Sequence, residues 1–159
     1  MSKSEQGLLS LEAAPQLHLN NQVCFAAYAL SRRITQAYQP YLKKLGLTYP
    51  QYLVLLVLWE ARENGEQSVR VGRLCEELML DTGTVTPLLK RMEQSGLLSR
   101  CRASDDERVV VITLTDAGVE LRNEVLSLPF ETLCTLDMEV AEALSLKDRM
   151  WQWLKRWAG

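Results

Sequence analysis

The sequence has little of what metal or cofactor chemistry needs. It contains one histidine, His18, and four widely spaced cysteines with no Cys-x-x-Cys pair. Zinc sites draw their ligands from closely spaced cysteine and histidine pairs, so this spacing argues against zinc. A single histidine leaves no plausible Ser-His-Asp set, and no glycine-rich phosphate-binding loop is present. We therefore expect no metal, no cofactor and no hydrolase.

Long apolar runs are also missing. The longest, residues 52–59, is far shorter than the about 20 residues that span a bilayer, and it favours a buried helix. Residues 1–15 contain Glu5 and Glu12 and lack the apolar centre of a signal peptide. We expect a cytoplasmic protein without membrane contact, whose thiols are free at rest because the compartment is reducing.

Excess charge of one sign is absent as well. The formal net charge is −2, which argues against a protein that binds any nucleic acid through overall charge. Sequence-specific binding needs only a local basic surface and remains open. With 159 residues, 47% hydrophobic and 24% charged, the chain fits one soluble globular domain with helical arms.

Residues 71–114 carry the pattern of two short helices followed by two strands. Apolar side chains recur at helical spacing over 71–78 and again over 85–92, with a polar turn expected at 81–84. Pro87 is a local misfit because proline removes a backbone hydrogen bond inside a helix. We expect the second helix to start near residue 84 or to begin with an irregular turn.

The end of this pattern predicts a wing. Gly96 suits the position that terminates a helix. Extended runs at 97–102 and 109–114 flank a charged tip, residues 103–108. The order predicts a mainly α fold with a small β-wing, a winged helix-turn-helix. The alternative is a small helical domain with an ordinary charged hairpin.

A winged helix-turn-helix presents the N-terminal end of its second helix to the DNA major groove. Short hydroxyl side chains there let the backbone approach base edges, and nearby cations meet phosphates. On these grounds the candidate contacts to a double-stranded DNA operator are Thr82, Thr84, Thr86, Lys90 and Arg91, with Arg100, Arg102 and Arg108 beside the wing.

The remaining segments suggest a homodimer. We expect a flexible arm at 1–18, a DNA-binding domain at 48–114, and a helical dimerisation region made of 19–47 and 115–159. Two adjacent apolar stripes on the first helix form a face wider than one partner helix covers. Three tryptophans occupy the last nine residues. The alternative is that these tryptophans cap the core of a monomer.

Caps and prolines predict the helix boundaries. The first helix is expected from about residue 19 to Tyr38 or on to Leu45, with a kink or break at Pro40. Thr48 and Gln51 form a capping box for the second helix. That helix is expected to run through Trp59. The later expectations are a loop at 61–68, a cap at Thr115, an interruption at Pro129 and a last helix from about Asp137.

Four separate blocks resemble the organic-hydroperoxide regulators of the MarR family. They are residues 21–28, 47–53, 81–91 and 105–108, and the third includes the awkward Pro87. The resemblance implies a dimeric winged-helix repressor that binds a pseudo-palindromic operator when reduced. It also implies that an organic hydroperoxide releases the DNA by oxidising one thiol.

The resemblance assigns roles to individual residues. Cys24 matches the reactive cysteine, and Tyr38 and Tyr49 match the tyrosines whose hydroxyls bond its sulfur across the dimer. Some relatives carry a resolving cysteine in the C-terminal region, which assigns to Cys134 an intersubunit disulfide with Cys24. Arg108 matches the arginine that the wing places in the minor groove. Asp81, Thr82 and Thr84 match the start of the recognition helix.

The residues themselves leave alternatives open. Cys24 shares a helical face with Tyr28 and Tyr38, and phenol donors stabilise a thiolate. A lone cysteine on an apolar helix face is otherwise a small core residue, as we expect of Cys75. One alternative is a MarR-type repressor that responds to a bound aromatic ligand. Another is a thiol peroxidase that uses Cys24, although the winged helix-turn-helix would then have no role.

Overall fold

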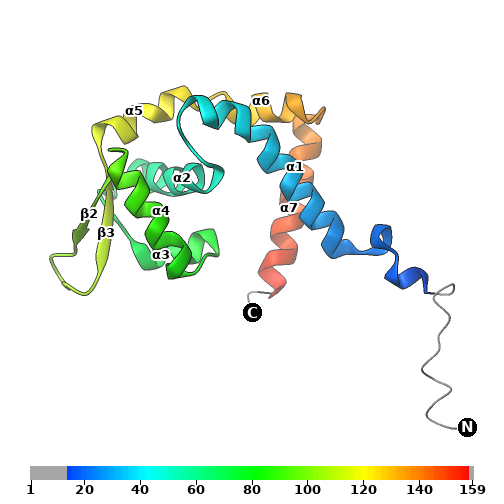
Figure 1. Cartoon of the computed structure of the whole chain (residues 1–159), viewed down its shortest axis with the longest axis horizontal. Coiled ribbons are helices and arrows are strands. Elements are labelled where there is room, and N and C mark those ends of the chain that lie inside the picture. Colours follow the sequence, from blue (N-terminus) through cyan, green and yellow to red (C-terminus); the bar gives the residue numbers. More distant parts are fainter. Residues whose placement is uncertain (1–13, 158–159) are drawn as a thin grey trace, which may run out of the picture. The chain divides into compact units, whose positions relative to one another are not determined.

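The computed structural model describes residues 14–157 (Figure 1). Two 3-10 helices, η2 (Pro15–Leu17) and η3 (Leu19–Asn21), precede helix α1 (Val23–Lys44). The prediction that α1 starts at residue 19 was wrong, because that stretch forms a 3-10 turn instead. Most of the expected N-terminal arm lies outside the described residues. The chain forms two compact units, one ending at Gln36 and the other beginning at Ala37, and α1 belongs to both.

Pro40 lies inside α1, which continues to Lys44, so the helix does not break there and follows the longer of the two expected courses. The next helix, α2 (Tyr49–Glu63), starts with the predicted capping box, in which the Thr48 N–H donates to Gln51 Oε1 at 2.8 Å. Helix α2 is buried along most of its length and forms the centre of the core. It extends four residues past Trp59, so the loop expected from residue 61 begins only at Asn64.

The helix-turn-helix consists of α3 (Val71–Leu78) and α4 (Thr82–Gln94). Met79 makes the connection in a left-handed conformation, with φ of 54°. Helix α4 includes most of the stretch expected as a polar turn, and Pro87 lies within it. The expected late start near residue 84 was therefore wrong. The predicted stop is confirmed: Gly96 has φ of +74°, and the Leu97 N–H donates back to the Met92 carbonyl.

A small antiparallel sheet forms the wing. Strands β2 (Leu98–Arg102) and β3 (Val110–Leu114) are the two predicted extended runs. A further strand, β1 (Val69–Arg70), pairs with β3 and gives the order β1-β3-β2. Figure 1 shows the β2–β3 hairpin projecting beside α4. The sequence did not predict β1 because two residues carry no alternating pattern.

Three helices follow the wing: α5 (Asp116–Glu124), α6 (Leu128–Thr135) and α7 (Val140–Trp157). The Thr115 cap is confirmed, since its hydroxyl accepts from the Gly118 N–H. Pro129 was expected to interrupt a helix, but it occupies the first turn of α6, where no hydrogen bond is lost through its missing N–H. The last helix starts three residues later than expected. No helix within residues 14–157 is both long and apolar enough to span a membrane.

Gly118 sets how closely α5 approaches the helix–wing junction. A Cβ atom at this position would lie 2.1 Å from the Leu97 carbonyl oxygen. The Gly118 carbonyl also accepts a buried hydrogen bond of 2.8 Å from the Trp59 indole. Only glycine allows the close approach to Leu97, and the carbonyl hydrogen bond ties the same position to α2.

We predict that Gly118→Ala lowers the free energy of unfolding by about 1–3 kcal/mol, because the methyl group forces the backbones apart. Urea denaturation measures the change. Gly72→Ala is the matched control, since a Cβ there meets nothing within 4 Å on an exposed turn of α3. Equal midpoints for the two variants would show that the close contact at Gly118 is unimportant.

Candidate nucleic-acid interface and thiol sites

Helix α4 has one buried face and one exposed face. The buried face is apolar and consists of Val85, Leu88, Leu89 and Met92. At its start the Asp81 carboxylate accepts from the Thr84 hydroxyl at 2.8 Å and from the Thr84 N–H at 2.9 Å. These hydrogen bonds lower the pKa of Asp81. Asp81 therefore caps the helix, and the Thr84 hydroxyl has its proton engaged, which leaves its oxygen to accept.

The predicted DNA-contacting residues lie on the exposed face of α4 and on the wing. Thr82, Thr86 and Arg108 line one groove of about 620 Å³ between α3, α4 and the wing. Lys90 and Arg91 are exposed farther along α4. Hydroxyl groups and arginine side chains, among them Arg108, thus line a groove bordered by a helix N-terminus, which suits contact with a nucleic-acid backbone.

Ion pairs and hydrogen bonds fix the wing. Glu93 of α4 accepts from the Arg100 N–H at 3.0 Å and from its guanidinium at 2.8 Å, which lowers the pKa of Glu93. At the tip, the Arg108 N–H donates to Asp106 and the Arg102 side chain donates to the Glu107 carbonyl. Arg100 and Arg102, predicted to flank the wing, are therefore engaged within the fold.

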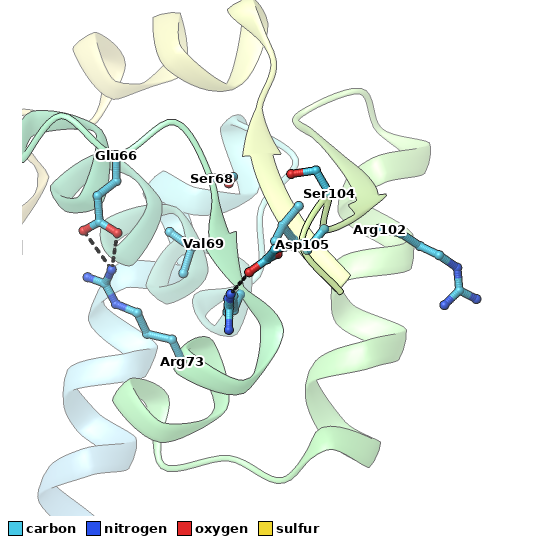
Figure 2. Close-up of a pocket in the computed structure, with 10 residues that line it drawn as sticks. Glu66, Ser68, Val69, Arg73, Arg102, Ser104 and Asp105 are labelled. Carbon is cyan, nitrogen blue, oxygen red and sulfur yellow. Dashed lines mark hydrogen bonds and ion pairs between the residues drawn. The ribbon is translucent and has the colours of Figure 1, made fainter. Parts of the chain in front are cut away.

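A second cavity, of about 490 Å³, lies against β1 and the wing tip (Figure 2). Within it Arg73 donates to Glu66 at 2.6 Å and also pairs with Glu77, and both carboxylates raise the pKa of Arg73. Asp105 accepts from Arg70 at 2.6 Å. Sequence reasoning missed Arg70 because its partner is 35 residues away and no local pattern marks such a pair.

Three tyrosines cluster where α1 meets α2. The ring centroid of Tyr38 is 5.2 Å from that of Tyr49 and 5.6 Å from that of Tyr52. Burial raises the pKa of all three phenols, and for Tyr52 burial together with the neighbouring phenols raises it to about 12. The phenols therefore keep their protons near neutral pH and can donate hydrogen bonds. The sequence singled out Tyr38 and Tyr49, whereas Tyr52 was expected only as the first residue of the buried apolar run 52–59.

Helix α6, which carries Cys134, packs beside the C-terminal half of α1. The Tyr41 hydroxyl lies 3.3 Å from the Thr135 hydroxyl. The hydroxyl of Thr132, a buried residue of α6, acts on Tyr38 and partly offsets the rise in its pKa. The Cys134 thiol is free and exposed. The tyrosine cluster and Cys134 therefore belong to one packed region.

Cys24 lies in the first turn of α1, within the unit that ends at Gln36, and its thiol is free and exposed. Its apolar neighbours Phe25 and Tyr28 are exposed too. Cys75 packs partly buried against the core, with its sulfur 3.8 Å from the Thr82 hydroxyl, and Cys101 is exposed on β2. The expectation that Cys75 is a packing residue agrees with this placement.

Comparison with known proteins gives a consistent result. The model of a family described as transcriptional regulator SarA/Rot matches residues 36–125. The organic hydroperoxide resistance transcriptional regulator of Bacillus subtilis (strain 168) is 49% identical over 113 residues, which are 71% of this chain and 74% of the relative.

Solved structures of AbfR from Staphylococcus epidermidis are also similar. The reduced, DNA-bound form is 39% identical with a TM-score of 0.70, and the match covers 91% of this chain and 97% of AbfR. The disulfide form is 38% identical with a TM-score of 0.61, covering 91% and 95%. These matches confirm the mainly α winged helix-turn-helix fold.

The tyrosine cluster predicts how stability depends on pH. Because the folded-state pKa of Tyr52 is raised from about 10 to about 12, the unfolded chain loses this proton first. The contribution of Tyr52 to the free energy of unfolding is therefore complete below about pH 10, and it is lost as the pH rises from about 10 to about 12. Tyr52→Phe should make the fall over this range shallower.

Urea denaturation at a series of pH values measures this slope. The free energies of unfolding of Tyr52→Phe and wild type at pH 7 differ because of the lost hydroxyl group, not because of titration. That difference is therefore subtracted from the values at every other pH. Parallel curves between pH 10 and 12 would contradict the assignment of this loss to Tyr52.

Proposed function

Since the chain belongs to the SarA/Rot family of MarR-type transcriptional regulators, we propose that it is a redox-sensing repressor controlled by one thiol. The reduced homodimer binds a pseudo-palindromic DNA operator. An organic hydroperoxide oxidises Cys24 and the DNA is released. The main support is the protonated tyrosine cluster beside the helix of a second exposed thiol, in a chain 49% identical to an organic hydroperoxide resistance regulator.

DNA binding is assigned to residues 48–114. The exposed face of α4 enters the major groove with Thr82, Thr84 and Thr86, and Asp81 holds the start of that helix. Lys90 and Arg91 meet phosphates. Arg108 reaches the minor groove; within residues 14–157 no carboxylate pairs with its guanidinium, so its charge is available to DNA.

Dimerisation is assigned to residues 19–47 and 115–159. Both segments carry large apolar side chains that a single chain leaves in solvent, which is costly unless another surface covers them. On the first they are Val23, Phe25 and Tyr28, and on the second Phe130, Leu144, Met150, Trp151, Trp153 and Leu154. This exposure argues against tryptophans that cap a monomer core. A second copy of the chain covers both sets.

The sensing step begins with the Cys24 thiolate, which attacks the outer oxygen of the hydroperoxide. The O–O bond breaks, the sulfur becomes a sulfenic acid, and the alkoxide leaves as an alcohol after taking a proton. In the reduced dimer Tyr38 and Tyr49 donate hydrogen bonds to the sulfur across the interface, which stabilises the thiolate. Their protonated state suits this role.

The second thiol ends the reaction. Cys134 of one chain condenses with the sulfenic acid at Cys24 of the other, which forms a disulfide and releases water. This bond draws Cys24 away from the tyrosines and changes the spacing of the two recognition helices, so they no longer match successive major grooves. A dithiol reductant returns both sulfurs to thiols and restores binding.

We predict that Arg108→Gln weakens DNA binding and lowers its salt dependence. Loss of one phosphate-neutralising contact should reduce the slope of log K against log salt by about 0.9. The affinity and its salt slope are measured by fluorescence anisotropy of the reduced protein. The duplex used is one recovered by selection from a random pool. Lys155→Gln, an equal change of charge in the last turn of α7, should leave the slope unchanged. An unchanged slope for Arg108→Gln would remove Arg108 from the interface.

The thiol step has a separate test. Wild-type protein treated with a slight excess of cumene hydroperoxide should run as a covalent dimer on a non-reducing gel, whereas Cys24→Ser and Cys134→Ser should not. Mass spectrometry of Cys134→Ser should find oxygen added at Cys24. An unmodified Cys24 in all samples would reject the redox mechanism and favour a regulator that responds to a bound aromatic ligand.

A further inference from the structure

Arg70 occupies a position between the two cavities that border the wing. It caps the start of α3, and in β1 it lies opposite Val111 of β3. Its side chain lines both the groove that contains Thr82, Thr86 and Arg108 and the cavity beside Asp105. Arg70 is therefore within reach of the surface assigned to DNA, although its guanidinium is paired with the wing tip.

Two other arginines of the groove, Arg73 and Arg100, are committed to the fold. Arg73 is held by two carboxylates, Glu66 and Glu77, and Figure 2 shows the first of these pairs. Arg100 is held by Glu93, which also accepts from its backbone N–H. Neither guanidinium can turn to a phosphate without losing hydrogen bonds and ion pairs within the protein.

Arg70 has one partner only among residues 14–157, and that partner is an exposed carboxylate. Arg70 donates to Asp105 at 2.6 Å, and the two side chains are 57% and 63% exposed. An ion pair this exposed contributes little, because water and salt compete for both groups. A DNA phosphodiester offers a guanidinium one negative charge and two acceptor oxygens, as a carboxylate does, and its neutralisation also releases counterions that are condensed on the duplex. Exchange of Asp105 for a phosphate is therefore favourable near DNA.

We propose that Arg70 is a DNA-backbone contact which Asp105 masks in the free protein, and that a phosphate replaces the Asp105 carboxylate on binding. The proposal rests on the proposed function, since it needs DNA in the groove. In the free protein the pair holds the wing tip against β1 and cancels one positive charge. Masking lowers the affinity for DNA of any sequence, so the sequence specificity of binding depends on the base contacts of α4.

Two substitutions should act in opposite directions. Asp105→Asn unmasks Arg70 and should tighten binding by up to about fivefold, the range of an exposed ion pair. Arg70→Gln removes the phosphate contact and should weaken binding, with a salt slope smaller by about 0.9. Arg70→Lys keeps the charge and should keep most of the slope. Glu107→Gln is the matched control for Asp105→Asn, because it removes one negative charge from the same exposed loop.

The measurement is fluorescence anisotropy of the reduced protein at several salt concentrations, on a selected duplex and on a scrambled duplex of the same composition. Thermal unfolding followed by circular dichroism checks that each variant is folded. Masking predicts tighter binding of Asp105→Asn to both duplexes, by more than Glu107→Gln achieves.

Three results would overturn the masking of Arg70 by Asp105. The first is weaker DNA binding by Asp105→Asn, and the second is a gain in affinity no larger than that of Glu107→Gln. The third is an unchanged salt slope for Arg70→Gln. Weaker binding by both Asp105→Asn and Arg70→Gln would mean that the pair braces the wing. These results leave the proposed function intact, whereas wild-type protein that binds neither duplex rejects the function itself.

Discussion

The buried apolar face of α4 is the constraint on which the surface assigned to DNA depends. Val85, Leu89 and Met92 are almost completely buried, so the helix cannot rotate without exposing them to water. Its threonines and cations are therefore held outward. The Asp81 cap fixes where the helix begins, and Glu93 fixes the wing relative to its end. A few contacts of ordinary strength thus place the two elements that we assign to DNA, α4 and the wing, on one face.

The proposed thiol chemistry lies in a different part of the chain from the surface assigned to DNA. The tyrosine cluster and α6 pack around the C-terminal half of α1, and α2 links that region to α3 and α4 through the core. A change at the tyrosines can thereby reach the recognition helix through packed helices and needs no flexible linker. The exposed apolar side chains of α1 and α7 favour the proposed dimer.

Features with a local cause could be predicted from the sequence. The capping box at Thr48, the stop at Gly96 and the apolar spacing of α3 and α4 each need only a few neighbouring residues. Features with a distant cause could not. Strand β1 exists because β3 pairs with it, and the Arg70–Asp105 pair joins residues that only the fold brings together. Pro129 was misjudged because proline both ends helices and starts them, and only the structure distinguishes the two.

The proposed switch depends on one step, in which oxidation of Cys24 releases DNA. Its most direct test is a titration of the reduced protein–DNA complex with cumene hydroperoxide, followed by fluorescence anisotropy and then by addition of dithiothreitol. The account predicts release at about one hydroperoxide per chain, recovery with the dithiol, and no release for Cys24→Ser, which should bind DNA like wild type when reduced. Release from Cys24→Ser at the same hydroperoxide concentration, or a wild-type complex that persists with Cys24 fully oxidised, would contradict it.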